Sequence, residues 1–271
     1  RPSENHLTNQ LKPMNFIRSV GAKTLGFIQS LGSITLFFLH ILAKSGTAFT
    51  RPRLSIRQVY FAGVLSVLIV AVSGLFVGMV LGLQGYTQLA KFKSADILGY
   101  MVAASLLREL GPVLAAILFA SSAGGAMTSE IGLMKTTEQL EAMNVMAVDP
   151  VARVVAPRFW AGVFSMPLLA SIFNVAGIYG AYLVGVEWLG LDGGIFWSQM
   201  QNNITFHYDV LNGLIKSAAF GVAVTLIAVH QGFHCVPTSE GILRASTRTV
   251  VSSALTILAV DFMLTAWMFT D

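Results

Sequence analysis

The chain has 271 residues, of which 55% are hydrophobic and 11% are charged, whereas a soluble domain carries about 25% charged residues. This composition excludes a soluble globular protein and predicts an all-α integral membrane protein. The net charge of +4 comes from short clusters of Lys and Arg between apolar segments, a pattern typical of charge at a membrane surface, so we expect no nucleic-acid partner. One cysteine allows no internal disulfide and no multi-cysteine metal motif.

Residues 1–50 are predicted to form an N-terminal interfacial helix region. The first residues lack a charged start followed by a short apolar core, so we expect no cleavable signal peptide there. Residues 24–43 are uncharged and long enough to span a membrane, but basic residues lie on both sides of them. Basic flanks place both ends on the cytoplasmic face, which favours an amphipathic helix in the interface. A sixth span is the alternative.

Residues 51–271 contain the apolar segments of a five-span membrane domain. A spanning helix needs about 20 apolar residues, and the segments that meet this length lie at about 55–87, 96–126, 158–186, 209–233 and 248–270. With a cytoplasmic N-terminus, 13 of the 17 Lys and Arg residues fall on the cytoplasmic side and only Lys91 and Lys93 on the other. The asymmetry predicts a cytoplasmic N-terminus and an external C-terminus.

The first span carries glycines at a spacing of four, Gly74, Gly78 and Gly82. Such glycines line one helix face and let another backbone approach closely. The partner is either another helix of the same chain or a second copy in a homodimer. The same span ends with Gln84 and Tyr86, which place an amide and a phenol near the outer interface.

Four ionisable side chains are predicted inside the spans. Arg108 and Glu109 lie about 18–20 Å along the second span, at 1.5 Å per residue, and Lys216 and Asp261 lie in the outer halves of the fourth and fifth. Pro112 lacks a backbone N–H, which frees the carbonyl of Arg108. A charge at the helix centre costs at least about 2.5–3.5 kcal/mol, so the two cations and two anions are expected to neutralise one another. They form a structural ion-pair network, a polar patch that acts in transport, or a proton relay.

A short helix is predicted between the second and third spans, within residues 131–149. Thr136 followed by Gln139 resembles a capping box that would open this helix. Its residues fall on two faces, with Leu140 and Met143 on one and Glu138 and Glu141 on the other. The helix is either a docking site for a cytoplasmic partner or an ordinary surface helix.

Known catalytic motifs are not found in the sequence. There is no phosphate-binding loop of the nucleotide hydrolases, no nucleophile elbow and no zinc-protease motif. His230, His234 and Cys235 are close in sequence, but no acidic residue accompanies them before Glu240, so we expect no metal site. The chain is therefore predicted not to be an enzyme and to hold no cofactor, and any ATP hydrolysis would occur on another chain.

Five long motifs in this order identify a known family. They are GLFVGMVLGLQGY (74–86), LLRELGPVLAAILFA (106–120), EIGLMKTTEQLEAM (130–143), AVDPVARVVAPRFWAGV (147–163) and VPTSEGILRASTRTVV (236–251). From about residue 50 to the end, the chain closely resembles MlaE, the permease family of the Mla phospholipid-transport ABC systems of Gram-negative bacteria.

The resemblance implies the location and the partners. Such permeases are homodimers in the bacterial inner membrane, and two copies of a cytoplasmic ABC ATPase, which binds ATP and Mg, dock on the coupling helix around residues 133–146. A STAS-domain protein binds the ATPase, and a hexameric MCE-domain protein sits on the periplasmic side. A phospholipid pocket lies between the two permease copies.

The resemblance also implies roles for individual residues. The residues expected to bind lipid are Leu81, Gln84, Tyr86, Leu89, Arg108, Glu109 and Leu110. Those expected in the buried charge network are Arg108, Glu109, Lys216 and Asp261. Those expected to couple to the ATPase are Glu138, Gln139, Leu140, Glu141 and Met143. The expected function is transfer of glycerophospholipid between the inner membrane and a periplasmic carrier, which maintains outer-membrane lipid asymmetry. The alternative is an ion-coupled secondary transporter that uses the buried charges.

Overall fold

The computed structural model describes residue 29, residues 32–46 and residues 52–268, and the chain divides into a unit of residues 1–43 and a unit of residues 44–271. An apolar helix at Gly32–Lys44 has 13 residues, fewer than the roughly 20 that a span requires. The choice between an interfacial helix and a sixth span stays a prediction. The remaining residues of the predicted stretch, 24–28, 30 and 31, lie outside the described residues.

The unit of residues 44–271 contains five helical segments long and apolar enough to cross a membrane. They run over Ile56–Lys91, Ala95–Thr136, Val151–Trp188, Phe206–His234 and Ser239–Met268. No strand occurs in the described part of the chain. The prediction of an all-α membrane protein with five spans is confirmed.

Several segments combine α-helices with π-helical turns, labelled η. The first contains α3 (Pro52–Val59), η1 (Tyr60–Val64) and α4 (Leu65–Lys91). The second begins with the 3-10 turn η2 (Ala95–Ile97) and continues through α5 (Leu98–Ser105), η3 (Leu106–Leu110), α6 (Gly111–Phe119), η4 (Ala120–Gly124) and α7 (Gly125–Thr136). The third contains η5 (Val151–Val155), α9 (Ala156–Tyr182) and η6 (Leu183–Trp188), the fourth η7 (Phe206–Val210) and α11 (Leu211–His234), and the fifth is α12 (Ser239–Met268).

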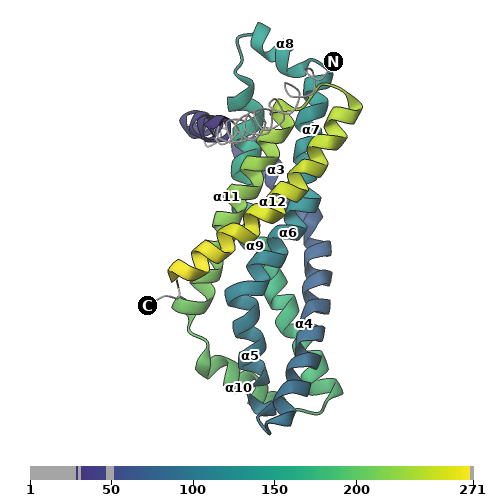
Figure 1. Ribbon diagram of the computed structural model, residues 1–271, viewed down its shortest axis with the longest axis vertical. Helices are drawn as coiled ribbons and strands as arrows, with labels where there is room; N and C mark the ends of the chain where they lie inside the picture. The colour runs from purple at the N-terminus through teal and green to yellow at the C-terminus, as the bar shows by residue number, and fades with distance from the viewer. Residues whose placement is uncertain (1–28, 30–31, 47–51, 269–271) are drawn as a thin grey trace, which may run out of the picture. The chain divides into compact units, whose positions relative to one another are not determined.

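Two short helices lie at opposite ends of this unit, α8 (Gln139–Val145) and α10 (Gly193–Asn203) (Figure 1). The second segment has 42 residues and is about 63 Å long at 1.5 Å per residue, twice the thickness of the hydrocarbon core. Its α7 end therefore extends beyond the apolar layer toward α8. The helices also begin earlier than the apolar spans predicted at 158–186 and 248–270.

The glycine face of α4 packs against α9 within the same chain. A Cβ atom built on Gly78 would lie 1.8 Å from the carbonyl oxygen of Gly177, and one on Gly74 would lie 2.6 Å from that of Phe173. Gly82 meets the backbone of Ala181 in the same way. This contact selects the intramolecular alternative, and a homodimer seam along these glycines is excluded.

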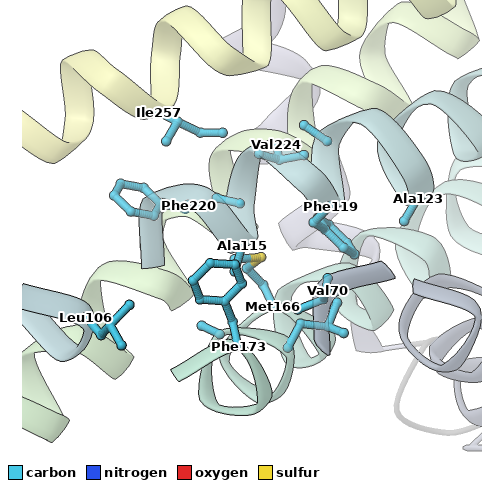
Figure 2. Close-up of a cluster of buried hydrophobic side chains, with 14 of the residues drawn as sticks. Val70, Leu106, Ala115, Phe119, Ala123, Met166, Phe173, Phe220, Val224 and Ile257 are labelled. Carbon is cyan, nitrogen blue, oxygen red and sulfur yellow. The ribbon is translucent and has the colours of Figure 1, made fainter. Parts of the chain in front are cut away.

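One core joins all five segments. Val70 of α4, Phe119 of α6, Phe173 of α9, Phe220 of α11 and Ile257 of α12 are completely buried, and Figure 2 shows them converging in one cluster. The bundle therefore holds the helices in fixed register around the polar groups described next.

Hydrogen bonds of one buried threonine add a second contact between segments. The hydroxyl of Thr128 in α7 lies within hydrogen-bond distance of the carbonyl of Ala228 in α11, 3.0 Å away, and of the hydroxyl of Thr249 in α12, 2.9 Å away. Polar contacts of this kind stabilise helix pairs in a membrane. They connect α7, α11 and α12 on the α8 side of the core.

Candidate functional site

Lys216 of α11 is the centre of a buried charge cluster. Its side chain is 0% exposed, and its ammonium nitrogen donates hydrogen bonds to Glu109 Oε1 at 3.0 Å and to Thr265 Oγ1 at 2.7 Å. A third bond goes to the carbonyl oxygen of Arg108 at 3.1 Å. An ammonium group has three donors, so all three are used. Asp261 Oδ1 lies 3.4 Å from the same nitrogen and forms a second ion pair.

The backbone around Pro112 explains why Lys216 reaches this position. Pro112 lies in the first turn of α6, directly after η3, and because it lacks an N–H the carbonyl of Arg108 is left to Lys216. α11 also approaches η3 closely, since a Cβ atom on Gly213 would lie 2.3 Å from the carbonyl oxygen of Leu107. Gly213 is three residues before Lys216, so the close approach and the lysine share one helix face.

Arg108 does not belong to the Lys216 cluster through its side chain. Its guanidinium pairs with Asp209 of η7, whose side chain is 1% exposed. The other oxygen of Asp209 accepts a 2.7 Å hydrogen bond from the backbone N–H of Thr205, which precedes the helix. The four predicted charges are therefore divided into two groups, one around Lys216 and one formed by Arg108 and Asp209.

Two members of these groups are absent from the sequence-based prediction. In the sequence Asp209 marks only the start of the fourth predicted span, and nothing in its local sequence identifies Arg108 as its partner. Thr265 follows Asp261 by four residues on α12, so the i,i+4 spacing places both on one face and offers a signal for it. Its hydroxyl accepts from Lys216 and lies 3.3 Å from both carboxylate oxygens of Glu109.

The cluster is open on one side. The lysine is enclosed, whereas the side chain of Glu109 is 38% exposed and that of Asp261 is 19% exposed. The arrangement holds the cation inside the bundle, leaves the Glu109 side chain partly accessible, and buries Asp261 Oδ1, the oxygen that faces Lys216. Such a group can stabilise the packing of the second, fourth and fifth segments and can also meet a polar ligand.

A cavity of about 410 Å³ lies between α4 and α5. Leu81 and Gln84 of α4 line it together with Met101 and Ser105 of α5. Arg108, Glu109 and Leu110 come one turn after Ser105 along the same segment but do not line this cavity.

The remaining residues predicted to bind lipid are placed differently. Leu89 is only 9% exposed and belongs to the apolar core, against which Tyr86 and Leu110 also pack. The cavity thus brings together Leu81 and Gln84 but not Leu89. The roles of all seven residues in lipid binding stay predictions.

The short helix α8 exists, but the predicted capping box is wrong. Thr136 is the last residue of α7, and its hydroxyl donates to the carbonyl of Gly132 at 2.9 Å, a bond within the preceding helix. Glu138 precedes α8 in a left-handed conformation with φ of 57° and makes no side-chain cap. A reversal of the backbone, rather than a capping side chain, separates α7 from α8.

One face of α8 is held against the protein and another is free. Leu140 is buried and Met143 is half-buried, whereas Glu138, Gln139 and Glu141 are exposed. The residue after α8 that turns the chain is Ala147, with φ of 56°. Leu140 therefore holds α8 against the protein, and Glu138, Gln139 and Glu141 form an exposed polar face.

Lys135 links the end of α7 to the end of α11. Its ammonium group donates to the carbonyl oxygens of Phe233 at 3.0 Å and Cys235 at 2.9 Å. A cation at the carboxyl end of a helix satisfies free carbonyls and interacts favourably with the helix dipole. The end of α7 is therefore bonded to the end of α11, the helix that carries Lys216.

The rings of His230 and His234 lie 4.3 Å apart, and Cys235 is buried beside them. Across the residues that the structure describes, no group of three or more His, Cys, Asp or Glu side chains could hold a metal ion.

Comparison with known proteins identifies the family. A family model described as Permease MlaE matches residues 55–267. The chain belongs to the MlaE permease family. This confirms the resemblance seen in the motifs, and it places α4 through most of α12 within the MlaE match.

The MlaE relatives cover most of the chain. It is 59% identical over 216 residues to the intermembrane phospholipid transport system permease protein MlaE of Haemophilus influenzae, which covers 80% of this chain and 83% of that protein. It is 36% identical over 220 residues to a probable ABC transporter permease protein of Rickettsia felis, with the same coverage. A probable ABC transporter permease protein of a Synechocystis strain is 32% identical over 217 residues, or 80% of this chain and 82% of that protein.

Proposed function

We propose that this chain is the permease subunit of an ABC transporter that moves phospholipids between the inner membrane and a periplasmic carrier. The observation that carries the proposal is the 59% identity to a protein named for intermembrane phospholipid transport. The excess of basic residues at the α8 end supports a cytoplasmic position for that end and a periplasmic position for the C-terminus. Transport by this subunit would maintain lipid asymmetry of the outer membrane.

The energy for transport comes from a partner ATPase that binds ATP and Mg. Its docking site is α8, which presents Glu138, Gln139 and Glu141 to the solvent while Leu140 anchors the helix. α8 is joined through α7 to the segment that carries Glu109, and through Lys135 to the end of α11. ATP-driven movement of α8 therefore reaches both sides of the Lys216 cluster.

The lipid site forms where two copies of the permease meet at the α10 end. The cavity lined by Leu81 and Gln84 takes part of the lipid, and Arg108 and Glu109 lie one turn deeper along the same segment. A periplasmic MCE-domain hexamer receives or delivers the lipid, and a STAS-domain protein associates through the ATPase. The resemblance of the chain to MlaE permeases supports the proposal of these partners.

The test is native mass spectrometry of the full chain purified with the products of its chromosomal neighbours. We expect two permease copies, two ATPase copies and bound phospholipid. Leu81→Trp fills the cavity and should remove the lipid, whereas Leu83→Trp alters an exposed neighbour and should retain it. A complex without an ATPase, or equal lipid in both variants, would contradict the proposal.

An ion-coupled transporter is the second candidate, because Lys216 with two carboxylates is a group that could exchange protons or cations. It predicts lipid movement in vesicles that contain this chain and an ion gradient but no ATPase. We expect no movement under that condition.

A further inference from the structure

A second cavity, of about 640 Å³, lies along α11 and α12 on the α8 side of the bundle. Gln231 of α11 forms part of its wall, and Arg244, Arg248, Val251 and Leu255 of α12 form much of the rest. None of these residues lines the cavity at Leu81 or belongs to the Lys216 cluster. We call this surface the arginine groove.

One half of the arginine groove is cationic. Arg244 and Arg248 are four residues apart and share one face of α12, about 6 Å apart along the helix axis. Arg244 pairs with Glu240, but both side chains are about 70% exposed, and such exposed i,i+4 pairs are weak. The side chain of Arg248 has no ion pair or hydrogen bond among the described residues. Both guanidinium groups can therefore bind an anion.

The other half of the groove is apolar and exposed. Val251 and Leu255 are 56% and 65% exposed and lie about 4.5 and 10 Å beyond Arg248 toward the membrane centre. An inner-leaflet phospholipid has the same order of groups, with the phosphate at the membrane surface and the acyl chain below it. A free phosphate ion would leave the apolar half empty.

We infer that the arginine groove binds an anionic phospholipid of the leaflet at the α8 end, with its phosphate on Arg244 and Arg248 and an acyl chain along Val251 and Leu255. Guanidinium groups bind phosphate oxygens through paired N–H donors, and the amide of Gln231 offers a further donor from the facing helix. The inference rests on the proposed function for one point, that this end of the helices faces the cytoplasmic leaflet. It adds a lipid site at the opposite end from the cavity at Leu81.

An ordinary basic residue at a membrane surface offers a simple comparison. Arg153 in η5 is exposed on the same side of the bundle and lies outside the arginine groove. It attracts anionic lipids in general, but it does not line the arginine groove. Arg153→Gln is therefore the matched control for charge removal.

The test places a photo-reactive benzoylphenylalanine at Leu255 of the full chain and measures labelling by phospholipid in vesicles. The vesicles contain radiolabelled phosphatidylglycerol and unlabelled phosphatidylcholine in equal parts. A cation near an anionic membrane surface raises local affinity about fivefold. We expect Arg248→Gln to lower labelling about fivefold, the Arg244→Gln/Arg248→Gln double variant to lower it further, and Arg153→Gln to leave it unchanged. Arg248→Gln alters one exposed side chain, so it tests the site even if the double variant does not fold.

Three outcomes would overturn the inference. Labelling that is equal in all variants would mean that only bulk lipid reaches Leu255, and a photoproduct between two chains would mean that a second copy covers the groove. Labelling of the parent chain by radioactive phosphatidylcholine that equals its labelling by phosphatidylglycerol would show no preference for an anionic lipid. The same photo-reactive group at Leu81 tests the proposed transport site separately. If lipid labels the group at Leu255 but not the group at Leu81, the result contradicts the proposed function and not the arginine groove.

Discussion

Replacing Lys216 by methionine removes the charge at the centre of the buried cluster while keeping most of the side-chain volume. The change leaves Glu109 Oε1, Thr265 Oγ1 and the carbonyl of Arg108 without the donor that lies 2.7–3.1 Å from each of them. It also leaves Asp261 without the cation 3.4 Å away. No other cation forms an ion pair with Glu109 or Asp261 among the described residues.

The cost can be worked from the exposure of the partners. Breaking a buried ion pair by removing one member destabilises a protein by about 3–5 kcal/mol. Because the Glu109 side chain is 38% exposed and that of Asp261 is 19% exposed, water stabilises part of the remaining charge. We therefore expect Lys216→Met to lower the free energy of unfolding by about 3 kcal/mol. The assay is reversible unfolding in mixed detergent micelles by titration with dodecyl sulfate, followed by circular dichroism.

A triple variant separates the loss of charge balance from the loss of packing. Lys216→Met with Glu109→Gln and Asp261→Asn removes all three charges, and neutral groups in place of a buried ion pair are well tolerated. It should recover most of the lost free energy. Lys91→Met, at an exposed position, is the control and should change little. The reasoning is refuted if Lys216→Met unfolds within about 0.5 kcal/mol of the parent chain, or if the triple variant is no more stable than the single one.

Three further changes test the packing and the helix ends. Gly78→Ala places a Cβ atom 1.8 Å from the carbonyl oxygen of Gly177 and should cost about 1–3 kcal/mol by overpacking, measured by thermal unfolding. Asp192→Ala removes the side chain that accepts from the N–H of Ile195 at the start of α10. It should cost about 1 kcal/mol and speed hydrogen exchange in that turn. Partial burial acts to raise the pKa of Asp149, but bonds from Lys44 and the Val151 N–H lower it overall. At neutral pH the Asp149→Asn variant should therefore be less stable than the parent chain by under about 1 kcal/mol. This difference in stability should disappear as the pH falls below about 3.8 and through the lowered pKa of Asp149.

Each of these changes has its own control. Gly46 has no atom within 4 Å of an added Cβ, so Gly46→Ala should have no comparable cost; equal losses at both glycines would contradict the α4–α9 contact. Thr136→Ala should not change the rate of hydrogen exchange at the start of α8, because Thr136 does not cap that helix. Faster exchange there would show that Thr136 does cap α8. A stability difference at Asp149 that persists in acid would show that its charge is not the cause.

The five spans could be predicted because a membrane makes length and apolarity decisive. Every lipid-facing backbone group must be bonded within its own helix, so a long apolar segment allows one structure. The ends of the helices could not be predicted in this way. Arg153 and Arg244 lie before the predicted apolar segments, but a helix can continue into water, so the third helix begins at Val151 and the fifth at Ser239.

The charge cluster could be predicted in part. The cost of a buried charge required partners for Lys216, and the missing N–H of Pro112 indicated that the carbonyl of Arg108 was available. The pairing of Arg108 with Asp209 depends on how η7 meets η3, which is tertiary structure and leaves no mark in the local sequence. The glycines of α4 show the same limit, since their spacing requires a close neighbour but does not identify α9.

The short helix α8 illustrates a local pattern overridden by its neighbours. Thr136 and Gln139 have the spacing of a capping box, but α7 continues through Thr136 and ends there. The backbone then reverses at Glu138 with positive φ, a conformation that no simple residue pattern favours at a glutamate.

The most direct test of the central claim is transfer of a fluorescent phospholipid from vesicles that contain this chain and its co-purified ATPase to acceptor vesicles that carry the periplasmic carrier. The account predicts transfer that requires ATP, persists with Leu83→Trp and is lost with Leu81→Trp. Transfer that proceeds equally without ATP, or that is unchanged when the cavity at Leu81 is filled, would contradict it.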